Sequence, residues 1–184
     1  LPSMITDPNF SSWLFSNYDY NGDGVLSASE CANVTYINLN VVNYDIASMQ
    51  GIEFLPNLVE LRCFGTRTWD SGQRKYINNG KLTSLDVSQN KKLEILRCYY
   101  NNITELDLSN NTALTYFDCG SNPLGALDVT NNTELTFLNC FGAGLTSLDV
   151  SKNTKLVTLY CDQNQLTGLD VSHNPVLENL YCYT

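Results

Sequence analysis

Hydrophobic residues recur along most of this chain with a period of 21 positions. From Leu93 the sequence reads LEILRCYYNNITELDLSNNTA, and three segments of the same length and pattern follow, before a final fragment LENLYCYT. Cysteine marks the same position of every segment: Cys98, Cys119, Cys140, Cys161 and Cys182. A fixed period of this length predicts stacked structural repeats that share one core.

Around each cysteine, apolar positions alternate with polar or aromatic ones. In LRCY, Leu96 and Cys98 share one face of an extended segment, and Arg97 and Tyr99 share the other. The alternation predicts a short strand in each repeat, and stacking predicts a parallel sheet over a continuous Leu and Cys core. The later segment L-D-V-S-x-N is expected to add further leucines to this core: Leu106, Leu127, Leu148 and Leu169.

The repeats extend toward the start of the chain. Cys63 precedes Cys98 by 35 residues, which is one repeat plus 14 inserted residues, so an insertion occupies about 65–80. A degenerate repeat, VTYINLN, comes before it. We therefore predict a small N-terminal cap at 1–33 and repeats at 34–184.

The pattern Leu-x-x-Leu-x-Cys-x-x-Asn resembles the leucine-rich repeat, in particular the internalin-like repeats of bacterial cell-surface proteins that carry a cysteine ladder. The resemblance covers about residues 34–184. It implies a right-handed solenoid with a parallel concave sheet, little regular helix on the convex side, and a non-catalytic extracellular or cell-surface protein. Thr66 and Ala143 depart from the asparagine position, which three other repeats fill: Asn101, Asn122 and Asn164.

The segment DYNGDGVLSASE, ahead of the repeats, resembles an EF-hand loop. The ligand positions of such a loop hold Asp19, Asn21, Asp23, Val25 through its carbonyl, Ser27 and Glu30. Ser27 and Glu30 also match a capping box, and Asp7 with Pro8 predicts the start of a preceding helix. The resemblance implies a structural Ca²⁺ in an EF-hand-like helical cap; an ordinary acidic turn is the alternative.

Two other columns of residues recur with the repeat. Parallel strands bring cysteine Cα atoms within bridging distance, but Cβ atoms that point inward side by side stay too far apart for a relaxed disulfide. We therefore predict six buried thiols in the ladder and leave the state of Cys31 open. Aspartates recur as turn formers, with metal binding as the alternative: Asp86, Asp107, Asp128, Asp149 and Asp170.

Composition narrows the function further. The net charge of −9 argues against a nucleic-acid partner, and no apolar run approaches the ~20 residues of a membrane helix. Residues 62–97 carry eight bases against three acids, between two acidic flanks. The chain starts at Leu1 instead of Met, so a leader is expected to have been removed. His173, the only histidine, lies in a turn, and we predict no enzymatic activity.

The outward strand positions and the insertion hold the predicted binding site. Aromatic, basic and amide side chains gather there, a composition typical of interfaces. The candidate ligand-binding residues are Arg62, Phe64, Trp69, Arg97, Tyr99, Tyr116, Asp118, Phe137, Asn139, Phe141, Tyr160 and Tyr181. The alternative is that these aromatic side chains only cover the sheet.

We therefore expect a protein-binding or adhesion module. A glycan is the alternative ligand, stacking on Tyr99, Tyr116 and Phe137 while Asp118 and Asn139 bond its hydroxyls. A structural spacer within a larger surface protein is the third reading. The last repeat ends with exposed core positions, so end-to-end self-association, or continuation by further repeats, is also expected.

Overall fold

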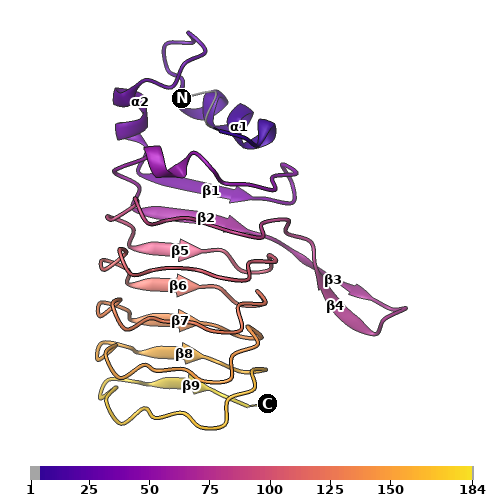
Figure 1. Ribbon diagram of the computed structural model, residues 1–184, viewed down its shortest axis with the longest axis vertical. Coiled ribbons are helices and arrows are strands. Elements are labelled where there is room, and N and C mark those ends of the chain that lie inside the picture. Colours follow the sequence, from indigo (N-terminus) through magenta and orange to yellow (C-terminus); the bar gives the residue numbers. More distant parts are fainter. Residues whose placement is uncertain (1–4, 184) are drawn as a thin grey trace.

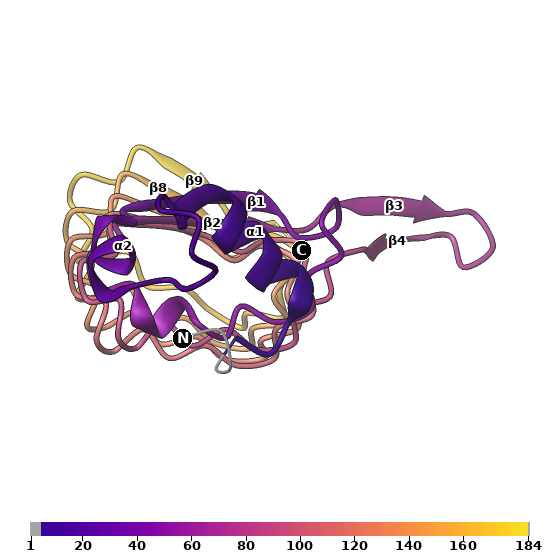
Figure 2. The same cartoon turned by 90° about the horizontal axis from the view of Figure 1, so that it is seen from above.

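A computed structural model describes residues 5–183; residues 1–4, at the start of the predicted cap, and residue 184 lie outside the described residues. Figure 1 shows a stack of turns, each of which contributes a strand to one continuous sheet. Two helices lie at the N-terminal end of the stack, and a hairpin projects from one side. Seen along the stack, the turns superpose around a shared interior (Figure 2).

Among the described residues, seven strands form the main sheet, in the order β1-β2-β5-β6-β7-β8-β9. They are β1 (Tyr36–Asn40), β2 (Glu60–Phe64), β5 (Ile95–Arg97), β6 (Tyr116–Asp118), β7 (Phe137–Asn139), β8 (Thr158–Tyr160) and β9 (Asn179–Tyr181). All neighbouring strands are parallel, and equivalent repeat positions lie opposite one another. The strand predicted in each repeat, including the degenerate first one, is confirmed.

The core runs through the interior of the turns. Leu61, Leu96 and Leu138 are fully buried, as are Cys63 and Cys98 of the ladder beside them. All seven cysteines are free, and burial raises the pKa of the Cys63 thiol to about 12. The prediction of buried ladder thiols is confirmed except at the last turn, where Cys182 is exposed. Cys31, whose state the sequence left open, is a buried thiol.

In the second set of predicted core leucines, Leu148 is buried as expected, and the other three are less buried than predicted. Leu106 and Leu127 are only half-buried at the edge of the core, and so is Leu169. The side chains two positions later, Leu108 and Val129, are almost completely buried instead. Both positions share one face of the extended segment, but the later one lies deeper in the core. The prediction therefore gave the correct face for these leucines and overestimated their burial.

Buried asparagines join consecutive turns. The Nδ2 of Asn132 donates to the carbonyl oxygens of Leu108 (3.1 Å) and Asn111 (2.9 Å) in the preceding turn. The same two bonds recur at the equivalent residues: Asn90, Asn111, Asn153 and Asn174. Buried carbonyls that the sheet does not pair therefore find donors, as a buried backbone requires.

A second asparagine column follows the cysteines. Asn122 donates to the carbonyls of Cys98 and Cys119, and Asn101 and Asn164 repeat the pattern. Ala143, which departs from the motif, has no amide to continue this column. Its backbone N–H instead donates to the Oδ1 of Asn164 at 3.0 Å.

Two helices form the N-terminal end. α1 (Pro8–Tyr18) begins at the N-cap Asp7, and α2 (Ala28–Asn33) begins with the predicted Ser27–Glu30 capping box. Phe10 and Leu14 of α1 are buried in the common core. Asp7 also accepts from the N–H groups of residues 47 and 48, which ties the helix start to the first turn of the solenoid. A short 3-10 helix, η2 (Ile52–Phe54), lies in the following connection.

The insertion forms an antiparallel hairpin of β3 (Arg67–Asp70) and β4 (Lys75–Asn78). The sequence placed the insertion correctly but did not predict strands in it. Gly65 and Gly80 bound it because the chain passes very close to the next turn there. A Cβ on Gly65 would lie 2.0 Å from the Tyr100 carbonyl, and one on Gly80 would lie 2.1 Å from the Asn101 Oδ1.

We expect Asn132→Ala to lower the free energy of unfolding by about 2–4 kcal/mol, because two buried carbonyls lose their donor. Urea unfolding followed by circular dichroism measures the loss. Asn131→Ala is the matched control, since Asn131 is the exposed neighbour, and should change stability by about 0.5 kcal/mol or less. Equal losses in the two variants would contradict the proposed role of the buried asparagines.

Candidate functional site

The solvent-facing side of the parallel sheet, called here the outer sheet face, carries three columns of side chains. The first contains Glu60, Ile95, Tyr116, Phe137, Thr158 and Asn179, and the second contains Arg62, Arg97, Asp118, Asn139, Tyr160 and Tyr181. The third begins at Phe64, the last residue of β2, and continues just beyond the ends of the other strands with Tyr99, Gly120, Phe141, Asp162 and Tyr183. The strand register confirms, for the first two columns, the neighbours expected from the repeat.

Aromatic rings stack along these columns. The ring centroids of Tyr116 and Phe137 are 4.1 Å apart with the planes nearly parallel, and those of Tyr160 and Tyr181 are 4.3 Å apart. The Arg97 guanidinium lies over the Tyr116 ring at 4.4 Å. These side chains are half-buried and remain accessible on the outer sheet face. The arrangement offers a partner flat apolar surface beside fixed positive charge.

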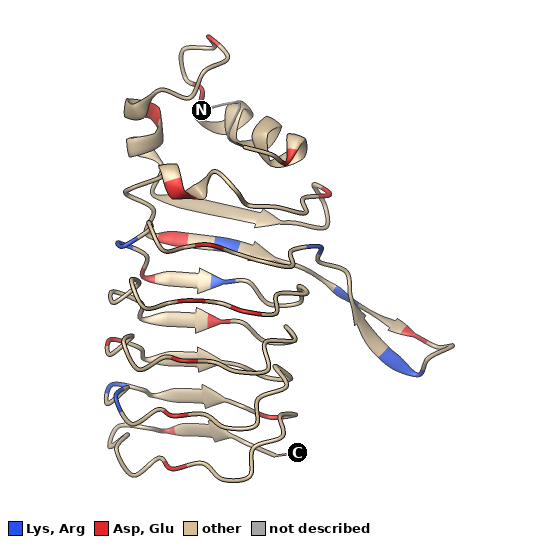
Figure 3. Ribbon diagram, in the orientation of Figure 1, with Lys and Arg blue, Asp and Glu red and all other residues tan. Residues whose placement is uncertain are grey.

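The hairpin is held against the edge of this face. The Nδ2 of Asn78 donates to the carbonyls of Asn101 and Ser121, which belong to two successive turns. The Arg67 guanidinium lies 4.4 Å from the Tyr76 ring centre and 5.0 Å from that of Tyr100. The outer part of the hairpin instead exposes Trp69 and Tyr76, at 56% and 57% of their surface. Figure 3 shows bases side by side on β2 and β5, and further bases along the hairpin that projects from the sheet.

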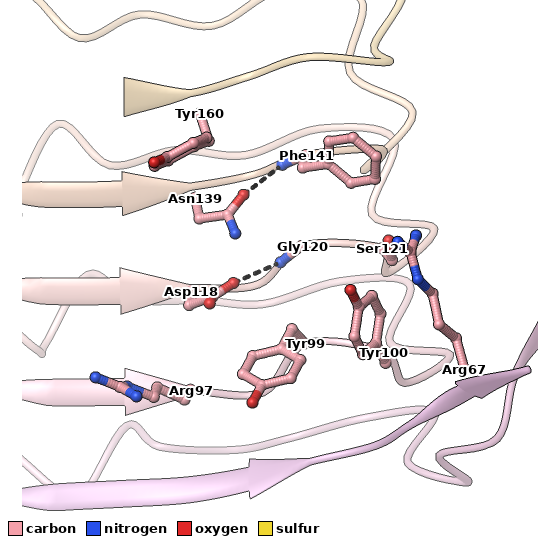
Figure 4. A pocket seen from close by; sticks show the side chains of 10 residues that line it. All are labelled: Arg67, Arg97, Tyr99, Tyr100, Asp118, Gly120, Ser121, Asn139, Phe141 and Tyr160. Carbon is pink, nitrogen blue, oxygen red and sulfur yellow. Dashed lines mark hydrogen bonds between the residues drawn. The ribbon is translucent and has the colours of Figure 1, made fainter. Parts of the chain in front are cut away.

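A pocket of about 440 Å³ lies between the hairpin root and the sheet. Figure 4 shows its lining: Arg67, Arg97, Tyr99, Tyr100, Asp118, Gly120, Ser121, Asn139, Phe141 and Tyr160. Six of the sequence-predicted residues meet here: Arg97, Tyr99, Asp118, Asn139, Phe141 and Tyr160. The other predicted residues are outside it, along the first two columns, on the neighbouring turn and on the hairpin: Arg62, Phe64, Trp69, Tyr116, Phe137 and Tyr181.

Asp118 is the one acid in the pocket lining and is only 9% exposed. Its Oδ1 accepts from the Gly120 N–H at 3.2 Å. Burial raises the pKa of its carboxyl to about 6, although this N–H, the Asn139 amide and the Arg97 charge act in the opposite direction. Desolvation therefore outweighs the favourable contacts, and the carboxylate is held at a cost in stability.

Four lining residues were absent from the predicted site: Arg67, Tyr100, Gly120 and Ser121. Tyr100 and Ser121 adopt left-handed backbone conformations, with φ of 58° and 57°, at equivalent positions of their repeats. Their turns bring them toward the hairpin, which the strand alternation could not indicate. Gly120 carries no side chain, so the only sign of its role in the sequence was glycine at a column position where neighbouring repeats have Tyr99 and Phe141.

The candidate calcium loop lies between α1 and α2. Gly22 and Gly24 have positive φ values of 70° and 75°, which suits the tight turn expected there. The carboxylate of Asp19 accepts from both of these N–H groups, and Glu30 accepts from the N–H groups of Tyr20 and Ser27. Bonds from Ser27 lower the pKa of the Glu30 carboxyl.

The all-oxygen donor set fits Ca²⁺ in chemistry. The side chains of the loop do not converge on one point, since no three His, Cys, Asp or Glu side chains in residues 5–183 lie close enough to hold a metal ion. Hydrogen bonds with loop amides leave further acceptor sites on each carboxylate. The side chains would therefore have to close around the ion.

The aspartate column and the histidine have structural partners. Asp107 accepts from the N–H of Ser109, two residues later, and the equivalent bond recurs at the other aspartates of the column: Asp86, Asp128, Asp149 and Asp170. The Ser109 hydroxyl and then its N–H lower the pKa of the Asp107 carboxyl. The recurring N–H bonds confirm the predicted turn-forming role. His173 lies exposed in its turn beside the Ser172 hydroxyl.

Asp118→Asn should raise the free energy of unfolding at pH 7.5, by up to about 3 kcal/mol, because the buried charge disappears. The folded-state pKa lies above the usual value near 3.8, so protonation stabilises the wild type as the pH falls through 6 toward 4. The advantage of the variant should therefore shrink over that range. Urea unfolding of both proteins between pH 4 and 8 measures it. Asp107→Asn, at an exposed acid, should show no such gain, and a pH-independent difference for Asp118→Asn would contradict the assignment.

No protein-family model and no curated protein sequence matches this chain. Among solved structures, the functional domain of InlJ from Listeria monocytogenes, which includes a cysteine ladder, is 36% identical, with a TM-score of 0.70 over 98% of this chain. An internalin, InlF, from L. monocytogenes is 20% identical, with a TM-score of 0.63 over 98% of this chain and 57% of its own. The leucine-rich-repeat protein LIC12759 from Leptospira interrogans is 19% identical, with a TM-score of 0.56 over 71% and 32% of the two chains.

This chain spans 41% of the InlJ structure, so the match concerns part of that domain. In residues 5–183, no helix is long and apolar enough to cross a membrane. The parallel sheet of stacked turns, the buried thiols and these likenesses agree. The protein has the leucine-rich-repeat fold and is similar to the cysteine-ladder domain of InlJ.

Proposed function

We propose that the protein is a non-catalytic binding module that docks a protein partner on its outer sheet face. The observation that carries the proposal is the pair of stacked aromatic columns beside Arg62 and Arg97. Tyrosine, phenylalanine and arginine are enriched at protein interfaces, where they supply large contact areas and directional polar groups. The likeness to internalin structures supports an adhesive role at the cell exterior.

The core does not account for these aromatic side chains. The turns are joined by buried leucines, thiols and asparagine amides, all on the opposite side of the strands. Cross-strand stacking does contribute to sheet stability, by roughly 0.2–1 kcal/mol for a pair. This is too little to explain ring pairs in two columns, so we assign them to recognition.

Electrostatics favours an acidic partner surface. Arg62 and Arg97 lie on adjacent strands in the second column, and Arg67 and Lys75 extend the basic region onto the hairpin. Arg62 is paired with Glu60 at 2.5 Å, which leaves Arg97 as the less compensated charge on the sheet. Opposite charges would steer a partner toward this end of the face, and salt would weaken that steering.

Tyr116→Ala combined with Phe137→Ala should weaken partner binding at least tenfold, because a stacked anchor is removed from the face. The measurement is surface plasmon resonance after a screen against purified extracellular proteins and a glycan array. Tyr44→Ala, at an exposed tyrosine in the first turn, is the matched control and should bind like wild type.

Binding to a protein that falls at 0.5 M NaCl would fit the basic region. Hits confined to glycans would favour the alternative ligand. An unchanged affinity in the double variant would remove the outer sheet face as the site. The spacer reading would gain if neither class of ligand bound.

We further propose that Ca²⁺ braces the N-terminal cap through the loop at Asp19 to Glu30. The loop joins α1 to α2, and residues of both helices contribute to the solenoid core. Closing six oxygen donors around one ion would fix the relative position of the helices. The proposal rests on the donor set and the two glycine turns described above.

EDTA should therefore lower the melting temperature by several degrees in low-calcium buffer, and added CaCl₂ should restore it. Differential scanning calorimetry measures the shift. Asp23→Ala should lower the melting temperature in calcium and make it insensitive to EDTA, whereas Asp45→Ala, at an exposed acid outside the loop, should keep the wild-type response. A wild-type melt that ignores both chelator and calcium would eliminate the calcium proposal.

A further inference from the structure

The third column of the outer sheet face keeps its register beyond the strand ends. The N–H of Gly65 donates to the carbonyl of Tyr99 at 2.8 Å, and that of Tyr100 donates to Gly120 at 2.9 Å. The next link, from the Ser121 N–H to the Phe141 carbonyl, measures 2.6 Å. Phe64, Tyr99, Gly120 and Phe141 therefore occupy successive steps of the stack, about 4.8 Å apart.

The aromatic column is interrupted at Gly120. Phe64 stacks on one face of Tyr99, with ring centroids 5.1 Å apart and an interplanar angle of 13°. Tyr99 also packs at right angles to Tyr100, with centroids 5.1 Å apart. The next step of the column is Gly120, which has no side chain, and Phe141 follows. Tyr99 and Phe141 thus lie two steps apart, about 9.6 Å, with an opening between them. Both line the pocket in Figure 4.

The backbone does not require glycine at this position. Gly120 is not among the residues with positive φ. A Cβ placed on it would meet the side chains of Asn139 and Asp118 at 3.4 Å, which is ordinary contact. A larger residue is therefore compatible with the fold, as Tyr99 and Phe141 show at neighbouring steps. The fold therefore does not account for the opening.

Polar groups form the floor of the opening. The buried Asp118 carboxylate presents acceptor sites beside the Asn139 amide. The Oδ1 of Asn139 accepts from the Phe141 N–H at 3.0 Å, and its Nδ2 group, which also bonds the Asp118 carboxyl, has a second N–H to donate. An acceptor beside a donor matches a pair of neighbouring hydroxyls, because each hydroxyl both donates and accepts.

Charge and shape limit the ligand further. Arg67 and Arg97 border the pocket, which contains a single acid, Asp118. A positively charged ligand would therefore be repelled by two charges and attracted by one. A neutral polyol meets no such repulsion. A pyranose ring combines an apolar C–H face, suited to contact with Tyr99 or Phe141, with hydroxyls at its rim. The volume of about 440 Å³ lies in the range of small-molecule sites.

We propose that the gap at Gly120 is a subsite for a pyranose ring, held between Tyr99 and Phe141 and hydrogen-bonded by Asp118 and Asn139. This inference rests on the proposed function, because the subsite lies on the same outer sheet face. The ligand of the outer sheet face would then include a sugar, carried either by the protein partner or by a polysaccharide. The stacked rings of the first column remain free to contact protein.

The probes are the methyl glycosides of glucose, galactose, mannose, N-acetylglucosamine and glucuronic acid, with N-acetylglutamate as a carboxylate probe. Saturation-transfer NMR should detect at least one glycoside, with a Kd on the order of 1 mM for so small a ligand. Gly120→Tyr fills the opening and should abolish the signal. Asp118→Asn should weaken binding at least tenfold, because it replaces a charged acceptor.

The controls separate this subsite from the protein-binding face. Gly120→Tyr should melt within a few degrees of wild type and still bind a protein partner through the first column. The double variant with Tyr116→Ala and Phe137→Ala should lose protein binding and keep glycoside binding. If no protein bound in the screen while the glycosides still bound, only the proposed function would be overturned, and the subsite would stand.

Three results would overturn the subsite. These are no glycoside signal at 50 mM, a signal that survives Gly120→Tyr, and binding of N-acetylglutamate alone. A glycoprotein compared before and after enzymatic deglycosylation, beside a soluble polysaccharide, identifies the source of the sugar. Loss on deglycosylation assigns it to a protein-borne glycan, and retention on the polysaccharide assigns it to a polymer; each result supports the subsite.

Discussion

Buried asparagine amides make the stacking of turns in this protein possible. Each turn leaves carbonyl groups inside the molecule that the short strands do not pair, and an unpaired buried carbonyl costs free energy. Asn132 and Asn122 each supply two such carbonyls with donors from one side chain. Because each donor reaches back one turn, the asparagines hold successive turns in register, even across the inserted hairpin, where Asn101 still bonds the Cys63 carbonyl. The hydrophobic core can then be continuous from the cap to the last described turn.

With the turns joined by the asparagine ladders, the two sides of each strand have different roles. Inward positions are limited to leucine, cysteine and a few apolar residues, since every turn must fit the one beneath it. Outward positions carry no such restriction, and there the chain varies from Tyr116 to Thr158 in one column. Variation on a rigid scaffold is how repeat proteins make specific surfaces. The fold therefore explains the inward residues, and a ligand is the natural explanation for the outward ones.

Sequence reasoning predicted most of this because the repeat transfers information between turns. One alternation, read at Leu96 and Cys98, applied to all the strands, and the aspartates and capping residues followed from local chemistry. The hairpin escaped prediction because it occurs once and has no second copy to compare. The depth of Leu106 was misjudged since alternation gives the face of a residue and not its distance from the core. The pocket was missed for a related reason, because its central feature at Gly120 is an absent side chain.

Two departures from the repeat coincide at a single step of the stack. Asp118 keeps a buried carboxylate whose raised pKa reports a cost in stability, and Gly120 gives up an aromatic contact that the backbone would tolerate. Both lie beside the one hairpin of the described chain, which Asn78 attaches to the turns that follow it. A strict array has little reason to accumulate unfavourable choices in one place. Local rules are most often broken where a site requires it, and the physical signs of a site converge on this step.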